Sequence, residues 1–407
     1  MIENIYDYVI VGAGTAAGNA VEGIRNQDPE GSILLIGKEA YLPYNRPDLS
    51  KKLWFGKKKV DQIYVNDEDF YTNNNVDVLM GIEVVGLNTV SRSIRDKKGS
   101  EWGYEKLLLA GGGSPRRLDI PGGDLEGISY YRYLDDYYAM KEQVDEDKTA
   151  VVIGGGFIGS ELAASLTMNK VSVTMVYPED WMVQRVFPQS LGEAVESDFK
   201  ERGISILKWD VPVKIEKLDG NRFLTTTRNG KRLESDILIV GAGIIPDTKL
   251  AADAGLKVGN GIVVDDHLRT SDPNVYAAGD NAFFPYIALG KEMRVEHWDN
   301  AVNQGRHAGW NMAGKGVVYD YMPYFFSDLF DFGYEAVGEL DSRMDFVADW
   351  ETENQTGVIY YLDDRRVRGV MTCNIYGKMD QARQMIREGK QVLQEQLCGV
   401  IQGSMAA

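Results

Sequence analysis

Two glycine-rich turns are the segments of this sequence with the clearest chemical use. Each follows an apolar run typical of a buried strand and precedes a helical pattern. Glycine lets the backbone bend sharply and approach a pyrophosphate, and the free N–H groups of a helix N-terminus bind the anion. Two such turns predict two bound dinucleotides. The predicted contacts are Gly12, Gly14, Thr15 and Ala16 in the first turn and Gly154, Gly156, Phe157 and Ile158 in the second.

A carboxylate closes the next strand after each turn, where it would accept hydrogen bonds from an adenosine ribose. Glu39 is the candidate beside the first turn and Glu179 the candidate beside the second. Because a carboxylate repels a 2′-phosphate, Glu179 favours NADH over NADPH. Arg185 lies nearby in sequence and keeps NADPH open as an alternative.

The turns must be positioned by two βαβ units, and the apolar periodicity predicts both. Between the two units, residues 81–94 and 101–110 are predicted strands, and Gly-rich turns at 121–123 and 241–243 are candidate domain boundaries. The predicted strand, helix and strand are Tyr8–Val11, Ala16–Ile24 and Ser32–Ile36 in the first unit, and Val151–Ile153, Ser160–Leu166 and Val171–Val176 in the second.

The domain organisation follows from these boundaries. We expect an α/β chain with a discontinuous dinucleotide-binding domain at 1–118 and 240–318, enclosing a second dinucleotide-binding domain at 119–239. From residue 319 the sequence pattern changes to short β-like runs rich in aromatic residues, which predicts a C-terminal α+β domain at 319–407. A final helix is expected over Met379–Gln402.

The composition narrows the class of protein. The chain has 407 residues, with 44 Lys and Arg against 61 Asp and Glu, a net charge of −17, which argues against nucleic-acid binding. The only cysteines, Cys373 and Cys398, have no metal-ligand spacing, so no metal site is expected. With no apolar run long enough for a membrane span and no secretory signal, we expect a cytoplasmic protein, monomeric or homodimeric.

One block of residues carries a family resemblance. The run from Glu39 to Lys51 matches the pattern E-x-x-x-P-Y-x-R-P-x-L-S-K, and the blocks around Asp280, Arg294–Ala301 and Phe326–Ala336 agree with it. The sequence therefore resembles the FAD-dependent reductases of ferredoxins and rubredoxins, and their relatives, the apoptosis-inducing-factor flavoproteins. The resemblance covers almost the whole chain and implies two Rossmann-like domains of the glutathione-reductase kind plus the C-terminal domain. By this resemblance, the domain at 1–118 and 240–318 binds FAD and the domain at 119–239 binds NADH.

The resemblance also implies roles for individual residues. Lys51 would reach toward the flavin and pair with Glu161, and these two are the candidate catalytic residues, since a cation there stabilises the reduced flavin. His297 lies in a flavin block but is expected to be structural, and Phe326 stands where many relatives carry Trp. The further implied cofactor contacts are Arg46, Arg116, Gly243, Asp280, Glu296, His297, Trp298 and Phe326.

These features lead to one function hypothesis and two alternatives. Because no cysteine lies near the turns, electrons must pass directly from the flavin to an external acceptor. Lysines 51, 52, 57, 58 and 59 form a basic cluster that would attract a small acidic ferredoxin or rubredoxin. The expected function is therefore an NADH-dependent flavoprotein reductase. The alternatives are a redox-gated signalling or assembly flavoprotein, with slow NADH oxidation and a charge-transfer complex, and an NADH oxidase.

Overall fold

The computed structural model describes residues 2–401, which form two compact units built from segments distant in sequence. The first unit consists of residues 2–46, 59–114 and 245–323, and the second of residues 47–58, 115–244 and 324–401. The chain passes between the units within η1 (Arg46–Leu49), after residue 58, within β7 (Gly113–Pro115) and β15 (Ile244–Pro246), and after residue 323. The three-domain division expected from the sequence stays a prediction.

A seven-stranded sheet forms the framework of the first unit. Its order is β3-β2-β1-β6-β5-β4, and β18 also pairs with β6. The β1, β2, β3, β6 and β18 strands are parallel, whereas β4 and β5 are antiparallel additions. The β2 strand is buried at every position, as expected of a central parallel strand. The bounds are β1 (Ile2–Val11), β2 (Ile33–Gly37), β3 (Val76–Met80), β4 (Val84–Asn88), β5 (Ser93–Asp96), β6 (Glu101–Leu109) and β18 (Val275–Ala277).

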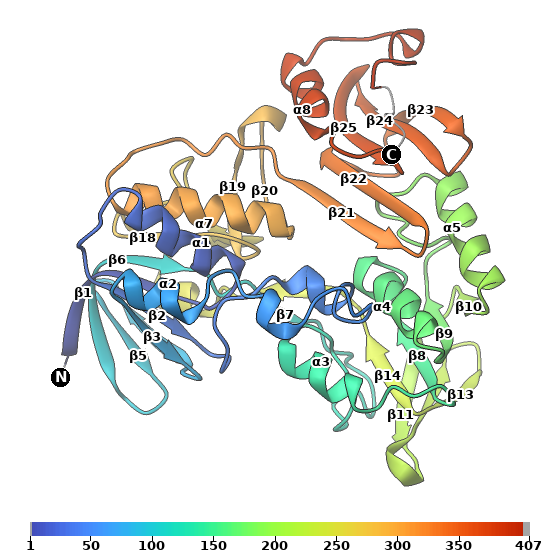
Figure 1. Cartoon of the computed structure of the whole chain (residues 1–407), viewed down its shortest axis with the longest axis horizontal. Coiled ribbons are helices and arrows are strands. Elements are labelled where there is room, and N and C mark those ends of the chain that lie inside the picture. Colours follow the sequence, from blue (N-terminus) through green and yellow to red (C-terminus); the bar gives the residue numbers. More distant parts are fainter. Residues whose placement is uncertain (1, 402–407) are drawn as a thin grey trace. The chain divides into compact units, whose positions relative to one another are not determined.

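Two helices pack side by side in this unit, α1 (Thr15–Arg25) and α7 (Trp298–Met312) (Figure 1). Their backbones approach closely: a Cβ added at Gly305 would lie 2.1 Å from the Ala16 carbonyl oxygen, and one at Gly309 would lie 2.3 Å from that of Ala20. Glycine is therefore required at the crossing. This packing joins the start of α1, at the first turn, to the helix that Trp298 begins.

Shorter elements complete the first unit. A small four-stranded sheet has the order β16-β17-β19-β20, and the remaining helices lie in the connections. The bounds are η2 (Val60–Gln62), α2 (Glu68–Asn73), α6 (Lys249–Asp253), β16 (Val258–Gly259), β17 (Gly261–Val263), β19 (Ala282–Tyr286), η4 (Ile287–Leu289) and β20 (Lys291–Met293).

The second unit contains a parallel sheet of order β10-β9-β8-β14. Its core joins this sheet to the antiparallel sheet β11-β12-β13, through buried residues such as Val151, Leu238 and Phe223. The bounds are α3 (Leu134–Lys141), β8 (Thr149–Ile153), α4 (Phe157–Met168), β9 (Ser172–Tyr177), α5 (Gln189–Glu201), β10 (Ser205–Lys208), β11 (Pro212–Lys217), η3 (Asp219–Asn221), β12 (Phe223–Thr227), β13 (Arg232–Ser235) and β14 (Ile237–Val240).

A five-stranded antiparallel sheet of order β21-β22-β25-β24-β23 belongs to the same unit, and α8 packs on β22 and β25 (Figure 1). The expected final helix is too long: α8 ends at Glu388 because Gly389 adopts a left-handed conformation, with φ of 55°. The bounds are β21 (Tyr324–Leu329), β22 (Phe332–Gly338), β23 (Asp345–Thr352), β24 (Thr356–Asp363), β25 (Arg366–Cys373), α8 (Met379–Glu388) and η5 (Gln394–Gln396).

Candidate functional site

The first glycine turn has the geometry of a pyrophosphate cradle. Gly12 has a φ of 126°, and a Cβ there would lie 2.2 Å from the Ala110 carbonyl oxygen, so no other residue fits. Gly14 precedes α1 in extended conformation, and its Cβ direction faces open space among the described residues. Thr15 and Ala16 form the first turn of α1. The residues present therefore fit a dinucleotide phosphate at this helix N-terminus.

Residues of the motif after β2 bond to one another. The Glu39 carboxylate pairs with Arg46, Oε1 to Nη2 at 2.6 Å, and accepts a hydrogen bond from the Tyr44 hydroxyl at 2.5 Å. Arg46 also donates to the Tyr44 hydroxyl at 2.9 Å. Both Glu39 oxygens are thus engaged, and the side chain is held rigidly just beyond β2. The role of Glu39 toward a ribose and that of Arg46 toward a flavin stay predictions.

The segments after β18 and before α7 bring four more of the predicted residues together. Arg294 donates to the Asp280 carbonyl oxygen at 3.1 Å and forms an ion pair with Glu296. The indole of Trp298 donates to the Asn45 side chain at 2.5 Å. Burial lowers the pKa of His297 to about 4, although the Asp280 charge acts in the opposite direction. His297 is therefore neutral at pH 7, which suits the structural role expected for it.

The second glycine turn repeats the geometry of the first. Gly154 has a φ of 116°, and its Cβ would lie 2.5 Å from the Gly241 carbonyl oxygen. A Cβ at Gly159 would lie 2.1 Å from the Gly154 carbonyl oxygen, so the first turn of α4 packs directly on the loop. Gly156 precedes α4, which starts at Phe157 and exposes Ile158. This turn, too, fits a dinucleotide phosphate.

Two other predicted residues lie on loops of the second unit. The Arg116 backbone N–H donates to the Gly243 carbonyl oxygen at 2.9 Å, which joins these two predicted cofactor contacts. Glu179 is exposed two residues beyond β9. The last residue of β9 is Tyr177, which is buried and donates its hydroxyl to the Glu196 carboxylate at 2.9 Å. Unlike the buried Glu196, Glu179 is thus open to solvent.

Lys51 and Glu161 form a buried ion pair, with Nζ and Oε1 3.0 Å apart and side chains only 6% and 7% exposed. Lys51 also donates to the Phe326 carbonyl oxygen at 3.3 Å, and its ammonium lies 4.7 Å from the centre of the Phe326 ring. An ion pair this deeply buried is costly to desolvate and is weak evidence for stability. The pair therefore holds two opposite charges at fixed positions inside the protein.

Two serines that were not among the predicted site residues complete this pair. The Ser50 hydroxyl donates to Glu161 Oε2 at 2.6 Å, and the Ser327 hydroxyl donates to Glu161 Oε1 at 2.5 Å. Both serines are buried. Each serine is adjacent in sequence to a predicted site residue, Lys51 or Phe326. This adjacency is the one feature of the sequence that could have identified them as site residues. The two hydroxyls fix the carboxylate that holds the Lys51 ammonium.

The basic cluster is smaller at the surface than the sequence predicts. Lys51 is buried in its ion pair, and Lys58 pairs with Asp48 at 2.9 Å. Lys52 and Lys57 are exposed. Of the cluster's members in the second unit, these two are the ones that present their charge to solvent.

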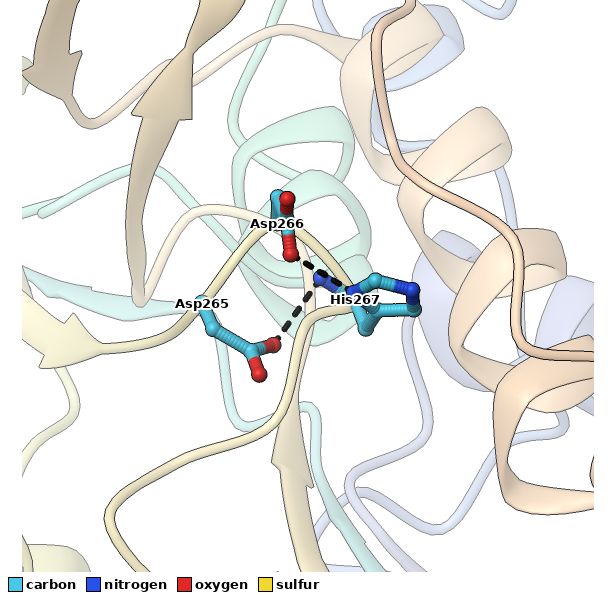
Figure 2. Close-up of side chains that lie close together, drawn as sticks. All are labelled: Asp265, Asp266 and His267. Atoms are coloured by element: carbon cyan, nitrogen blue, oxygen red, sulfur yellow. Dashed lines mark hydrogen bonds and ion pairs between the residues drawn. The ribbon is translucent and has the colours of Figure 1, made fainter.

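One group of acids with a histidine lies in the first unit, Asp265, Asp266 and His267 (Figure 2). Its members already bond within the protein. His267 Nδ1 lies 2.6 Å from Asp266, and Asp265 accepts from the His267 N–H at 2.9 Å and pairs with Arg269 at 2.7 Å. These bonds engage all three residues, so the cluster is explained by the hydrogen bonding of a turn.

Comparison with known proteins decides the family. The model of the pyridine nucleotide-disulphide oxidoreductases matches residues 6–305. The chain belongs to that family. It is an FAD-dependent NAD(P)H oxidoreductase that is similar to ferredoxin and rubredoxin reductases, and its fold is the glutathione-reductase-like α/β fold expected from the sequence.

Its relatives within the pyridine nucleotide-disulphide oxidoreductases include both branches that the sequence resembles. Apoptosis-inducing factor 1 of Dictyostelium discoideum is 34% identical over 94% of this chain and 78% of its own length. Rubredoxin-NAD(+) reductase of Pseudomonas putida is 34% identical over 82% and 86%. The crystal structure of a covalent putidaredoxin reductase–putidaredoxin complex superposes with a TM-score of 0.90, at 31% identity over 98% of this chain and 96% of the other.

This oxidoreductase departs from the disulphide chemistry in its family's name. Cys373 is buried on β25, where burial raises the pKa of its thiol, and Cys398 is exposed near the end of the described chain. Both are free thiols, and the sequence holds no other cysteine. No dithiol is therefore available beside either glycine turn. Among the helices between residues 2 and 401, none is both long and apolar enough to cross a membrane.

Proposed function

We propose that this protein is an NADH-dependent reductase that passes electrons from FAD to a small acidic iron–sulfur protein, a ferredoxin or rubredoxin. The buried Lys51–Glu161 pair carries the proposal, because Lys51 ends the run that matches the flavin motif of such reductases and Glu161 fixes its ammonium there. FAD, when bound, supplies the ring that accepts hydride and releases electrons.

The assignment of cofactors to turns rests on the motifs next to them. The Gly12 turn belongs with Glu39, Arg46, Asp280 and Trp298, all in the first unit, and we assign it to FAD. The Gly154 turn we assign to NADH. The protein's own contribution is to bind the two phosphates, hold each ribose and keep the Lys51 ammonium in place.

The preference for NADH is argued from charge. Glu179 is exposed where a 2′-phosphate would have to sit, and the two are repelled. The neighbouring Lys208 is already occupied, since it pairs with Glu196 at 3.1 Å, and is not left as a dedicated phosphate ligand. Arg185 is exposed and is the cation that would have to hold a 2′-phosphate against this repulsion. We expect a kcat/KM for NADH at least about tenfold above that for NADPH, and equal values would contradict the assignment.

The choice of acceptor is supported by the missing dithiol and by charge. Because no cysteine pair lies near the turns, electrons must leave for an external partner. Lys52 and Lys57 present positive charge on a chain of net charge −17. An acidic carrier would be steered to them and repelled elsewhere.

A signalling flavoprotein is the second candidate, since the apoptosis-inducing factor of Dictyostelium discoideum is as similar to this chain as the rubredoxin reductase. The two candidates predict different behaviour on anaerobic mixing with NADH. The reductase loses its flavin absorbance fast and keeps its elution volume on a sizing column. Slow bleaching, a persistent long-wavelength band and a changed elution volume would favour the signalling protein.

A further inference from the structure

The carboxyl ends of three adjacent parallel strands meet at one edge of the sheet in the second unit. The strand order is β10-β9-β8, so the loops that follow these strands are neighbours in the same order. The Gly154 turn follows β8 and Glu179 follows β9. The residue that follows β10 is Trp209. Along this edge, Trp209 therefore comes next after the proposed ribose position.

Trp209 is unusual in two respects. Its side chain is 63% exposed, although indole is among the largest apolar side chains. Its backbone also has a φ of 57°, a left-handed conformation that bulky residues rarely adopt. Strained residues of this kind persist where the surroundings hold them, and they cluster at ligand sites. The protein thus exposes an apolar ring to water on a residue with a strained backbone. This residue lies at the sheet edge where the second glycine turn would bind its dinucleotide.

Hydrogen bonds fix this ring to the loop that carries Glu179. The indole Nε1–H donates to Asp180 Oδ1 at 2.9 Å. Lys208 donates to the Asp180 carbonyl oxygen at 2.6 Å, and its ammonium lies 5.2 Å from the centre of the indole. Trp209 and the neighbour of Glu179 are therefore held as one rigid group.

A buried carboxylate holds the strand ends that carry this group of residues. Glu196, which is only 2% exposed, accepts from the Tyr177 hydroxyl at 2.9 Å and pairs with Lys208 at 3.1 Å. It also accepts from the Met182 backbone N–H at 3.1 Å. The ends of β9 and β10 are thus tied to the same carboxylate, which preorganises the indole before any ligand arrives.

We propose that Trp209 is the stacking residue for the adenine of NADH, beside a ribose bound by Glu179. The proposal rests on the proposed function, in which the second turn binds NADH. An exposed aromatic ring that is already held in place suits a purine, because stacking needs only a flat apolar face and no specific hydrogen bonds to the base. The bound dinucleotide would cover the ring and remove it from water.

The test uses Trp209→Asn, because asparagine tolerates the left-handed conformation and so leaves the fold unstrained. Calorimetric titration with ADP-ribose, which lacks the nicotinamide, should give a Kd about fivefold to tenfold higher than that of the wild-type protein. The Tm should be equal or higher. Trp209→Phe keeps an aromatic face without the indole N–H and should bind ADP-ribose within about twofold of wild type.

Kinetics provide an independent readout. In the holoenzyme, Trp209→Asn should lower kcat/KM for NADH by the same factor, through KM, and leave kcat unchanged. Reduced nicotinamide mononucleotide, which carries the same reactive ring without adenosine, should react with both proteins equally. Phe346→Ala removes an aromatic side chain that is 41% exposed on β23 of the same unit and serves as the matched control, with no change in either assay.

Several outcomes would overturn the inference. These are an unchanged Kd for ADP-ribose in Trp209→Asn, equal losses with NADH and with the mononucleotide, and a Trp209→Phe variant as weak as Trp209→Asn. Absence of ADP-ribose binding to the wild-type protein would also overturn it. Failure of the proposed function is seen separately, as a wild-type holoenzyme that is not reduced by NADH although it binds ADP-ribose through Trp209.

Discussion

At the scale of single residues, the structure shows which side chains hold the charged residues that the sequence predicts. Lys51 and Glu161 are predictable as a pair, because both lie in recognisable motifs. The two serines that bond to Glu161 are not, since Ser50 and Ser327 are 111 and 166 positions away from it in sequence. Only the packing of β21 against α4 brings the Ser327 segment to the carboxylate.

The Lys51–Glu161 pair can be tested by separating charge from stability. Lys51→Met leaves a buried carboxylate without its cation and should lower the free energy of unfolding by about 3–5 kcal/mol. The double variant Lys51→Met/Glu161→Gln removes both charges and should recover most of that stability. Its hydride transfer from NADH should stay at least about tenfold slower than wild type, because the cation is missing. Denaturant unfolding and single-turnover flavin bleaching measure the two effects.

A double variant that regains both stability and hydride transfer would show that the pair is structural only. Glu161→Gln alone serves as the comparison, since one serine can still donate to its amide oxygen and the other can accept from its amide NH2.

His297 should make stability depend on pH. Its pKa is lowered from 6.5 to about 4 in the folded protein, so below pH 6.5 the unfolded state binds more protons. Stability from this group is complete above pH 6.5 and is lost as the pH falls toward 4, with a slope of at most about 1.4 kcal/mol per pH unit. Urea unfolding between pH 4.5 and 7 measures it. His297→Gln should reduce the slope, and an unchanged slope would refute the assignment.

At the scale of elements, periodicity predicts the helices of the two βαβ units to within a few residues and the ends of their strands to within one, although β1 starts at Ile2 and not at Tyr8. The expected helix 16–24 is α1, Thr15–Arg25, and the expected helix 160–166 lies within α4, Phe157–Met168. The C-terminal helix is the clear error. The sequence pattern continues through Gly389, but the left-handed conformation of that glycine ends α8 at Glu388. A helix stop set by one backbone conformation is hard to infer from polarity alone.

The two glycine turns allow a paired test of cofactor assignment. Gly12→Ala would place a Cβ 2.2 Å from the Ala110 carbonyl oxygen, and Gly154→Ala one 2.5 Å from that of Gly241. Gly12→Ala should purify with little FAD, measured from the visible spectrum. Gly154→Ala should keep FAD and raise the KM for NADH at least about tenfold. Gly220→Ala, which shares the left-handed conformation at a site where a Cβ meets no described atom, is the control for strain. The reverse pattern of losses would contradict the assignment of the turns.

At the scale of the whole molecule, the proposed transfer of electrons to an external carrier rests on the net charge and the missing dithiol. A chain of net charge −17 repels an acidic carrier except where lysines are exposed. The sequence predicts the basic cluster but overstates it, because burial of Lys51 and the pairing of Lys58 with Asp48 depend on the fold. The choice of electron acceptor would depend on the exposed surface of the protein, and no sequence motif describes that surface.

Charge reversal tests the role of that surface. Lys52→Glu/Lys57→Glu should raise the KM for a ferredoxin or rubredoxin several-fold at low salt and flatten the dependence of kcat/KM on ionic strength. Reduction of ferricyanide, a small acceptor that needs no docking surface, should change far less. If the steady-state kinetics with the iron–sulfur protein were unchanged in the variant, these two lysines would have no part in docking.

The most direct test of the account is a stopped-flow measurement of how the reduced flavin returns its electrons. The FAD-loaded protein is reduced with NADH without air and then mixed with oxidised ferredoxin, oxidised rubredoxin or air-saturated buffer. We predict that one of the iron–sulfur proteins reoxidises the flavin at least about a hundredfold faster than air does. Reoxidation by air that is as fast as by either carrier, or a reduced flavin that persists with all three, would contradict the reductase function.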